Sequence, residues 1–409
     1  MSGPTCRFCG AALTCTFVDL GATPLANSYR DPGDTRAERR HKLHVRVCDS
    51  CLLVQVDAAV PAEAIFSDYA YFSSYARSWV EHARRYAVAA KERLKLGPDS
   101  LVVEVASNDG YLLRHFVEMG VPVLGIEPAA NVAAVAERAG VPTRVAFFGR
   151  ALGEALVAEG RMADLTAANN VLAHVSDLND FVAGFAAVLK PSGVATFEFP
   201  HLLRLIEGVQ FDTIYHEHFS YFSLLTVEHV FAAHGLRVFD VEELPTHGGS
   251  LRLWVCHAGA GFAAAPSLAK VRGDERAARL DRPEGYDGFA ARVAAVRDGL
   301  LGFLARVRAA GETVAAYGAA AKGNTLLNVC GVGPADIIWV ADANPHKQGR
   351  LLPGSGIPVV APERLRRDRP DWVLILPWNL KREIAQDHAY VHDWGGRFVV
   401  AVPAVEDVT

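Results

Sequence analysis

From Leu101 onward, short apolar runs alternate with helical stretches, and this alternation constrains the fold more than any other feature. Such a pattern is typical of a parallel sheet that is covered by helices on both faces. The sequence therefore predicts a doubly wound, Rossmann-like α/β domain. Its strands are expected at Leu101–Val105, Val121–Ile126, Leu165–Ala168, Gly193–Phe199, Leu236–Glu243 and Leu251–Cys256. The last two are separated by a Thr-His-Gly-Gly turn and should form an antiparallel hairpin.

A second, smaller alternation follows a helical stretch at Tyr286–Ala310 and predicts a C-terminal Rossmann-like α/β domain. Its strands are expected at Thr313–Tyr317, Asp336–Ala341, Val359–Ala361, Trp372–Ile375 and Phe398–Val402. Residues 259–283 are rich in Ala, Pro and charged residues and are interpreted as a linker. A chain of 409 residues is too long for one ordinary core. We expect three domains: an N-terminal module at 1–75, the central domain at 76–283 and the C-terminal domain at 284–409.

Composition excludes several classes of protein. With 51% apolar and 21% charged residues the chain is globular, and its formal net charge of −5 argues against a nucleic-acid-binding protein. No apolar run is long enough to span a membrane. The N-terminal sequence has no secretory signal pattern, and seven cysteines then indicate a reducing, cytoplasmic location. The sequence does not fix the oligomeric state, and a monomer is compatible with it.

The N-terminal module carries two C-x-x-C pairs, Cys6/Cys9 and Cys48/Cys51, with 38 residues between them. Each pair can present two thiolates to one ion, and four thiolates satisfy tetrahedral zinc. A redox role is the alternative, but redox proteins usually carry one such pair near a βαβ unit. We therefore predict a structural zinc site at Cys6, Cys9, Cys48 and Cys51, with no open position for catalysis.

A polar loop follows the first strand of the central domain, where open α/β folds bind ligands. It reads Glu104-Val-Ala106-Ser107-Asn108-Asp109-Gly110, and Glu127-Pro128 ends the next strand. A carboxylate at the second strand end can accept both ribose hydroxyls of an adenosine. Asp109 would repel a pyrophosphate, so S-adenosylmethionine fits better than NAD. The expected cofactor-binding residues are Glu104, Ala106, Ser107, Asn108, Gly110, Glu127 and Pro128, with Asn169 and Asn170 at the end of a neighbouring strand.

The run Tyr215–Phe222, YHEHFSYF, combines two His, a Glu and two Tyr, too many polar rings for packing alone. Metal ligation by His-x-His is one interpretation, and general acid–base chemistry is the other. We favour acid–base chemistry because the cysteines already account for zinc. His174 follows Asn169 and Asn170 and should face the same cleft. Tyr69, in an aromatic run, is either a site residue or part of a packing stripe.

These segments together resemble the sugar C-methyltransferases of deoxysugar biosynthesis, which act at C-3 of dTDP-linked 4-keto-hexoses. The resemblance covers nearly the whole chain and rests on several blocks in the same order. They are the C-x-x-C pairs, DYAYFSSYARSW (68–79), VEVASNDG (103–110), GIEP (125–128), NNVLAHV (169–175), FEFPH…YHEHFSYFS (197–223), HGGSLR (247–252) and YGAAAKGNTLLN (317–328). One departure is Ala106, where the family's loop usually has glycine.

The resemblance implies a methyl transfer to carbon. The C-4 carbonyl acidifies the C-3 proton, a base removes it, and the enolate attacks the sulfonium methyl group of S-adenosylmethionine. It implies His218 as the base, with Glu217, Tyr215, His174 and Tyr69 lining the sugar and stabilising the enolate. The expected substrate-binding residues are Tyr71, Ser73, His247, Arg252, Lys322 and Asn324. Lys322 lies in a strand-to-helix turn that is expected to hold the diphosphate of a dTDP-4-keto-hexose.

Three other functions remain open at this point. The C-terminal domain would suit an NAD(P)H-dependent 4-ketoreductase activity beside the methyl transfer, although its turn lacks a complete dinucleotide fingerprint and Asp342 is its one ribose-binding candidate. A sugar O-methyltransferase would differ in where the methyl group lands. A non-enzymatic zinc-ribbon adaptor is disfavoured by the acidic net charge and by the His/Glu/Tyr run.

Overall fold

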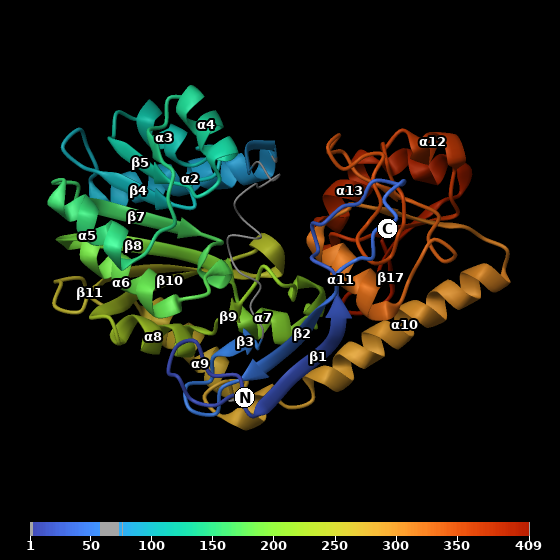
Figure 1. The fold of residues 1–409 in the computed structure, drawn as a ribbon, viewed down its shortest axis with the longest axis horizontal. Coiled ribbons are helices and arrows are strands. Elements are labelled where there is room, and N and C mark those ends of the chain that lie inside the picture. Colours follow the sequence, from blue (N-terminus) through green and yellow to red (C-terminus); the bar gives the residue numbers. More distant parts are fainter. Residues whose placement is uncertain (1–2, 58–72, 76, 409) are drawn as a thin grey trace.

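The computed structural model describes residues 3–57, 73–75 and 77–408 of the chain. These residues form three sheets: a four-stranded N-terminal sheet, a seven-stranded central sheet and a six-stranded C-terminal sheet. The two larger sheets lie in separate lobes, and the N-terminal strands and the long helix α10 (Phe289–Ala309) connect them on one side (Figure 1). The predicted α/β class, with an N-terminal module and two Rossmann-like domains, is confirmed.

The N-terminal sheet has the order β1-β2-β3-β9 and is antiparallel throughout. Its strands are β1 (Cys15–Thr23), β2 (His41–Val47), β3 (Val54–Val56) and β9 (Ser220–Tyr221). The first three come from the N-terminal module. The fourth comes from the polar run of the central domain, where Val54 pairs with Tyr221. The sheet therefore joins the two parts of the chain through backbone hydrogen bonds.

The central sheet has the order β10-β11-β8-β7-β4-β5-β6, and the five strands from β8 to β6 are parallel. Its strands are β4 (Val102–Val105), β5 (Val123–Ile126), β6 (Thr143–Arg144), β7 (Ala163–Asn169), β8 (Leu189–Pro200), β10 (Leu236–Leu244) and β11 (Ser250–His257). β4 is buried at every residue, as expected of a Val-rich parallel strand that is covered on both faces. Strand order reverses between β4 and β7, the switch point at which such sheets bind ligands.

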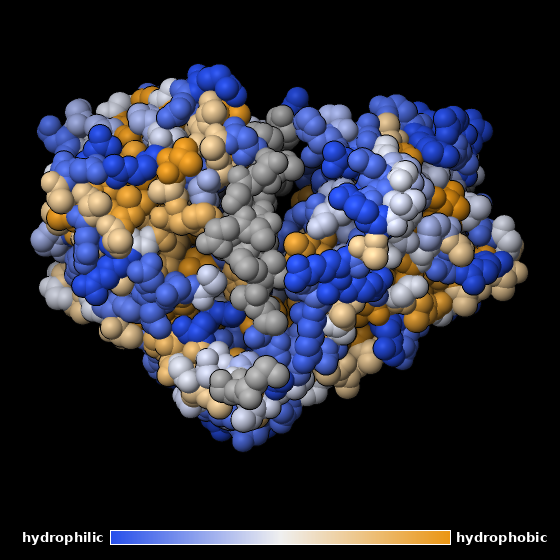
Figure 2. Space-filling model, in the orientation of Figure 1, coloured by the Kyte–Doolittle hydropathy of each residue, from blue (hydrophilic) through white to orange (hydrophobic). Residues whose placement is uncertain are grey.

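Helices cover both faces of this sheet, and short 3-10 turns (η) lie at its carboxyl edge. They are η1 (Ser73–Tyr75), α2 (Arg77–Leu94), α3 (Leu113–Glu118), α4 (Ala130–Arg138), α5 (Arg150–Ala158), η2 (Leu172–His174), α6 (Leu178–Val188), α7 (Leu202–Glu207), η3 (Phe211–Thr213), α8 (Leu224–Ala232) and η4 (Thr246–Gly248). All six predicted central strands are present, and β10 and β11 form the predicted antiparallel hairpin. A space-filling view shows polar residues over both lobes, with smaller apolar patches scattered among these polar residues (Figure 2).

The C-terminal sheet has the order β14-β13-β12-β15-β16-β17, and only the last strand runs antiparallel. Its strands are β12 (Val314–Tyr317), β13 (Val340–Ala341), β14 (Val359–Val360), β15 (Trp372–Ile375), β16 (Arg397–Val400) and β17 (Glu406–Val408). Its helical elements are α11 (Ala321–Cys330), α12 (Arg364–Asp368), η6 (Trp378–Leu380), α13 (Lys381–Asp387) and η7 (Ala389–Trp394). The switch point of this Rossmann-like sheet lies between β12 and β15. In the described part of the chain, no helix has the length and apolarity that a membrane span requires.

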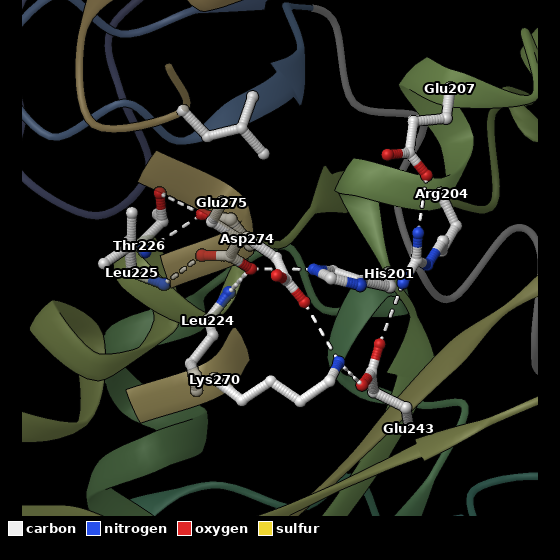
Figure 3. A network of polar contacts seen from close by, with 12 residues as sticks. His201, Arg204, Glu207, Leu224, Leu225, Thr226, Glu243, Lys270, Asp274 and Glu275 are labelled. Carbon is white, nitrogen blue, oxygen red and sulfur yellow. Dashed lines mark hydrogen bonds and ion pairs between the residues drawn. The ribbon is translucent and has the colours of Figure 1, made fainter. Parts of the chain in front are cut away.

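The interpretation of residues 259–283 as a linker is wrong. This segment contains the helix α9 (Pro266–Ala277), which packs against α8 and β10, and the turn η5 (Pro283–Tyr286) begins at its last residue. Its buried residues are Leu268, Val271 and Glu275. The Glu275 carboxylate accepts hydrogen bonds from the backbone N–H groups of Leu224 at 2.6 Å and Leu225 at 2.9 Å, at the start of α8 (Figure 3). Its Oε1 also lies 2.7 Å from Nε2 of His201. The first N–H groups of a helix have no acceptor within the helix, and Glu275 provides one for two of these groups in α8.

We expect Glu275→Ala to destabilise the protein by about 3–5 kcal/mol, because it leaves two backbone N–H groups and the buried His201 ring without their common partner. The matched control is Asp274→Ala on the same helix. Asp274 forms a surface ion pair with Lys270, 3.0 Å between Oδ2 and Nζ, and its loss should cost less than about 1 kcal/mol. Urea unfolding followed by circular dichroism measures both. Equal midpoints for the two variants would show that Glu275 does not stabilise α8.

Candidate functional site

The four predicted zinc ligands converge. The Sγ atoms of Cys6, Cys9, Cys48 and Cys51 all lie within 4.8 Å of one another, and the Cys6–Cys51 and Cys9–Cys48 pairs are each 3.5 Å apart. Tetrahedral zinc with bonds of about 2.3 Å requires sulfur atoms roughly 3.8 Å apart, so the geometry fits the ion. Cys15 is exposed and lies outside the cluster.

Residues around the cysteines tie this site to the central domain. The side-chain amide of Gln55 donates to Cys6 Sγ at 3.1 Å, and its Oε1 accepts from the Arg7 backbone N–H at 2.9 Å. The Arg7 guanidinium donates to the carbonyl oxygens of Val56, at 3.1 Å, and Phe219. Phe219 belongs to the polar run, so the residues that contact the zinc ligands also contact the segment that carries the acid–base candidates.

The loop after β4 forms the predicted strand-end site. Glu127, at the end of β5, is 5% exposed; its Oε2 accepts from the Asn108 N–H at 3.0 Å and its Oε1 from the Ala129 N–H at 2.9 Å, across Pro128. Burial raises the pKa of the Glu127 carboxyl, while both N–H groups oppose the shift. Glu104 is buried beside it, and burial followed by the charges of Glu127 and Asp109 raises its pKa. Acids therefore concentrate at this strand end.

Backbone geometry explains the family's glycine in this loop. Ala106 has φ of 56° and Asn108 has φ of 50°, both in the left-handed region, and Gly110 has φ of 78°. A left-handed alanine costs about 1–2 kcal/mol relative to glycine. The segment before α2 also closes on the loop, where the Ser73 N–H donates to Asn108 Oδ1 at 2.9 Å. Ser73 thus lies against the cofactor loop.

Polar atoms that find no hydrogen-bond partner among the described residues gather on this edge. The loop contributes Ser107 Oγ and Asp109 Oδ1, and the end of β7 contributes Asn169 Oδ1 and both side-chain amide atoms of Asn170. All are buried, and β4 and β7 are neighbours across the switch point. Buried polar groups are normally hydrogen-bonded, so such a cluster fits a polar ligand that supplies the partners. The residues present therefore fit S-adenosylmethionine, as predicted.

We expect Glu127→Ala to weaken binding of S-adenosylmethionine roughly 5- to 150-fold, the loss of about 1–3 kcal/mol for ribose hydroxyls left unpaired. Isothermal titration calorimetry measures the dissociation constant. The matched control is Glu137→Ala in the neighbouring helix α4, whose side chain is exposed. Wild-type affinity in Glu127→Ala would place the ribose elsewhere.

Two hydrogen bonds fix the tautomer of His218. Its Nδ1 lies 2.8 Å from the Thr213 carbonyl oxygen, which can only accept, so Nδ1 carries the hydrogen. Burial, followed by nearby His174, holds the pKa of the imidazole well below its usual range, so the ring is neutral and Nε2 is a hydrogen-bond acceptor. Nε2 lies 2.9 Å from the Tyr215 hydroxyl, which donates to it. The structure thus brings together His218, Tyr215 and His174, whose ring centroid is 4.6 Å from that of His218.

His216 and Glu217 of the same run face different partners. His216 Nε2 donates to the His41 carbonyl oxygen at 3.1 Å, at the start of β2. Glu217 Oε1 accepts from the Asn27 side-chain amide at 2.6 Å, and burial raises the pKa of Glu217 to about 7. In the described part of the chain, the four cysteines form the metal-type cluster that is found.

The C-terminal domain presents Lys322 at its own switch point. Lys322 Nζ donates to Asn379 Oδ1 at 2.7 Å and lies 4.9 Å from the centroid of the Trp378 ring. Trp378 Nε1 in turn donates to Asp212 Oδ2 at 2.7 Å, in η3 of the central domain. Burial lowers the pKa of Lys322, and the charge of Asp212 opposes this shift. The charge of Lys322 in turn helps to lower the pKa values of His218 and His247. Lys322 therefore lies where the two domains meet, near His218 and His247.

The remaining predicted site residues are placed as follows. His247 has a left-handed φ of 56° and its ring centroid is 5.2 Å from that of Trp79. Arg252 is 5% exposed, and its guanidinium donates to Glu198 at 2.7 Å and Glu242 at 3.1 Å.

Asn324 is buried in α11 and accepts from the Asn328 side chain at 3.3 Å. Tyr69 and Tyr71 lie outside the described residues.

Sequence reasoning missed residues that hold the site together. Asn27, Asp212 and Trp378 were not singled out, and neither was Glu198, which binds both Arg252 and His82, the latter at 2.9 Å. Glu198 is a charged residue within the apolar strand segment FEFPH. A charge in a buried strand requires a partner, so this residue could have indicated a buried ion pair. The other three have partners far away in the sequence and leave no local pattern.

Family models match the chain in three consecutive segments. They are described as "Putative zinc binding domain" over residues 6–66, "Methyltransferase domain" over 79–241 and "C-methyltransferase C-terminal domain" over 245–403. C-methyltransferase NovU of Streptomyces niveus is 38% identical over 399 residues, which cover 97% of this chain and 95% of NovU. Ubiquinone biosynthesis O-methyltransferase of Methylobacterium sp. (strain 4-46) is 34% identical over 107 residues, 24% of this chain and 42% of that enzyme.

Among solved structures, an S-adenosylmethionine-dependent methyltransferase from Clostridium acetobutylicum ATCC 824 matches with 13% identity and a TM-score of 0.37, covering 44% of this chain and 92% of that protein. The match to NovU extends over nearly the full length of both proteins, and the three family models follow the zinc module, the central domain and the C-terminal domain in order. The chain therefore belongs to the family of C-methyltransferases that includes NovU, and is an S-adenosylmethionine-dependent enzyme with a zinc-binding N-terminal module.

Proposed function

We propose that the enzyme methylates C-3 of a dTDP-linked 4-keto-deoxysugar in the biosynthesis of a natural product. The substrate class comes from the motif resemblance. The observation that carries the chemistry is the neutral His218, whose Nδ1–H is bound to Thr213 and whose Nε2 is paired with the Tyr215 hydroxyl. Methylation at carbon requires removal of a C–H proton, and a neutral imidazole with a defined tautomer is suited to that step.

In the proposed mechanism, the sugar lies between the carboxyl edge of the central sheet and Lys322 of the C-terminal domain. His218 Nε2, directly or through the Tyr215 hydroxyl, accepts the C-3 proton. The electron pair of the C–H bond moves into the C-3–C-4 bond, and negative charge develops on the C-4 oxygen. Lys322, Tyr215 and neighbouring His174 are the groups available to stabilise that charge. Loop 104–110, Glu127, Asn169 and Asn170 hold S-adenosylmethionine, which supplies the electrophilic methyl group when bound.

Substrate binding is proposed for both domains. The strand-to-helix turn before Lys322 would take the diphosphate, with the Lys322 ammonium as its cationic partner. Arg252 enters this model less directly than Lys322 does, because Glu198 and Glu242 already bind its guanidinium. His247, Ser73 and Asn324, with Tyr69 and Tyr71, complete the proposed contacts to the sugar nucleotide.

The test is incubation of the enzyme with S-adenosylmethionine and a panel of dTDP-4-keto-hexoses, followed by mass spectrometry and NMR of the products. The expected result is a mass gain of one methylene equivalent, with the new methyl carbon bonded to C-3. A methyl group found on oxygen would support an O-methyltransferase. Consumption of NAD(P)H with loss of the C-4 carbonyl would support the bifunctional ketoreductase. Conversion of no member of the panel would overturn the proposed substrate class.

A further inference from the structure

The connection between β1 and β2, residues 24–40, extends from the zinc module onto the C-terminal domain; we call it the arm. In Figure 1 the blue connection lies against the orange and red C-terminal lobe. Arg30 and Leu351 exchange two backbone hydrogen bonds, of 3.1 and 2.7 Å. The Gly354 N–H donates to Glu38 Oε2 at 2.8 Å, and the Tyr29 hydroxyl donates to the Ala319 carbonyl oxygen. These contacts hold the arm against the C-terminal domain.

The arm and the strand that follows it also hold two residues of the polar run. Asn27 Nδ2 donates to Glu217 Oε1 at 2.6 Å, and the carbonyl of His41, the first residue of β2, accepts from His216. Asn27 is exposed, whereas Glu217 is only 4% exposed. His218, in contrast, is held by Thr213 and Tyr215 of its own domain. Neighbouring residues of one motif thus depend on two different parts of the chain.

Electrostatics gives the Asn27 contact a definite consequence. Burial raises the pKa of Glu217 to about 7, and the Asn27 amide opposes this shift because it donates to the ionised carboxylate. The other titratable groups that face Glu217 are the Tyr29 phenol of the arm, whose pKa is raised by burial and by the charges of Asp342 and Glu217, and His174, which contacts the Glu217 backbone. In the described surroundings of Glu217, Asn27 is the side chain that favours its charged form.

We propose that Asn27 is a positioning residue of the sugar site, which orients the Glu217 carboxylate and makes the zinc module a part of the active centre. The inference rests on the proposed function, because it assigns Glu217 a place beside the sugar. A carboxylate held by an amide presents an acceptor to a sugar hydroxyl or amine in one fixed direction. Loss of the donor raises the pKa of the Glu217 carboxyl group further and removes the contact that fixes its direction.

The first test needs no substrate. The titration of Glu217 is followed by carbon-13 NMR of protein labelled at the glutamate side-chain carbonyl, with the signal assigned by its absence in Glu217→Gln. In Asn27→Ala the midpoint should rise, and in Asn27→Asp, which keeps the shape but adds a second acid, it should rise further. Ser28→Ala is the matched control, since Ser28 is the next exposed residue of the arm. Equal midpoints in wild type and Asn27→Ala would overturn the inference.

The second test is catalytic. Asn27→Ala should lower kcat for methyl transfer by about 10- to 100-fold, the range expected for loss of a hydrogen bond to a charged group. The acidic limb of its pH profile should move to higher pH, while zinc content and affinity for S-adenosylmethionine stay at wild-type values. A merely structural role would lower stability without moving the pH profile, and that result would overturn the proposal. A shifted Glu217 titration in an enzyme that converts no dTDP-4-keto-sugar would support the role of Asn27 while removing the proposed substrate.

Discussion

His218→Asn is expected to abolish most deuterium exchange at C-3 of a 4-keto-sugar, with a loss of about 10²–10⁴-fold in rate. Asparagine keeps much of the shape of histidine and can still donate to the Thr213 carbonyl, 2.8 Å from Nδ1 in the wild type. It has no basic nitrogen for the C-3 proton or for the Tyr215 hydroxyl. The measurement is proton NMR in D2O with S-adenosylhomocysteine present, so that no methyl transfer competes.

Binding separates loss of the base from loss of the fold. Affinities for S-adenosylmethionine and dTDP should stay within about twofold of wild type in His218→Asn, because neither contact is assigned to His218. Exchange at the wild-type rate would exclude His218 as the base and make His174 the next candidate, because its ring is in contact with that of His218. Loss of all exchange in Glu217→Gln, with normal exchange in His218→Asn, would assign proton removal to the carboxylate.

The second large effect concerns the zinc site. The purified enzyme should contain about one zinc per chain, and Cys48→Ser should lose it, because three thiolates hold the ion far less tightly than four. Structural zinc stabilises small modules by on the order of 10 kcal/mol, so solubility and melting temperature should fall sharply. The measurements are elemental analysis and differential scanning calorimetry.

Cys15→Ser provides the control for this experiment. Cys15 is exposed, lies outside the cluster and begins β1, so its substitution should leave zinc content and melting temperature unchanged. Both variants remove one thiol from the same module, but only Cys48 belongs to the buried four-cysteine cluster. Metal-free wild-type protein with four titratable thiols, purified without chelators, would contradict the structural role of zinc.

Much of the fold could be predicted because its signals are local. Parallel strands such as β4 and β12 are short apolar runs, and each is followed by a polar or small-residue turn that marks the carboxyl edge. The helix α9 was not predicted because few of its residues are buried and apolar. Leu268 and Val271 are followed on the same face by Glu275, so a buried charge interrupts the apolar periodicity and the segment reads as polar.

The sequence predicted those parts of the candidate site that belong to a local motif. It did not predict the parts that depend on contacts between distant segments. The C-x-x-C pairs and the loop after β4 combine residue types with spacing, and the structure brings each set together. The polar run at 215–222 looked like one cluster, yet His216 and Glu217 bind partners that lie 175 and 190 residues away. A local sequence pattern does not show which distant segments will contact each of its side chains in the folded protein.

The short strand β9 has a practical consequence for dissecting the enzyme. Ser220 and Tyr221 pair with Gln55 and Val54, so the sheet of the zinc module is completed by a segment that lies far downstream in the chain. A fragment that ends near residue 75 would leave β3 as an unprotected edge strand with free N–H and C=O groups, which is a template for intermolecular pairing and aggregation. A chimera that exchanges this module between relatives must therefore carry a matching 219–222 segment to remain soluble.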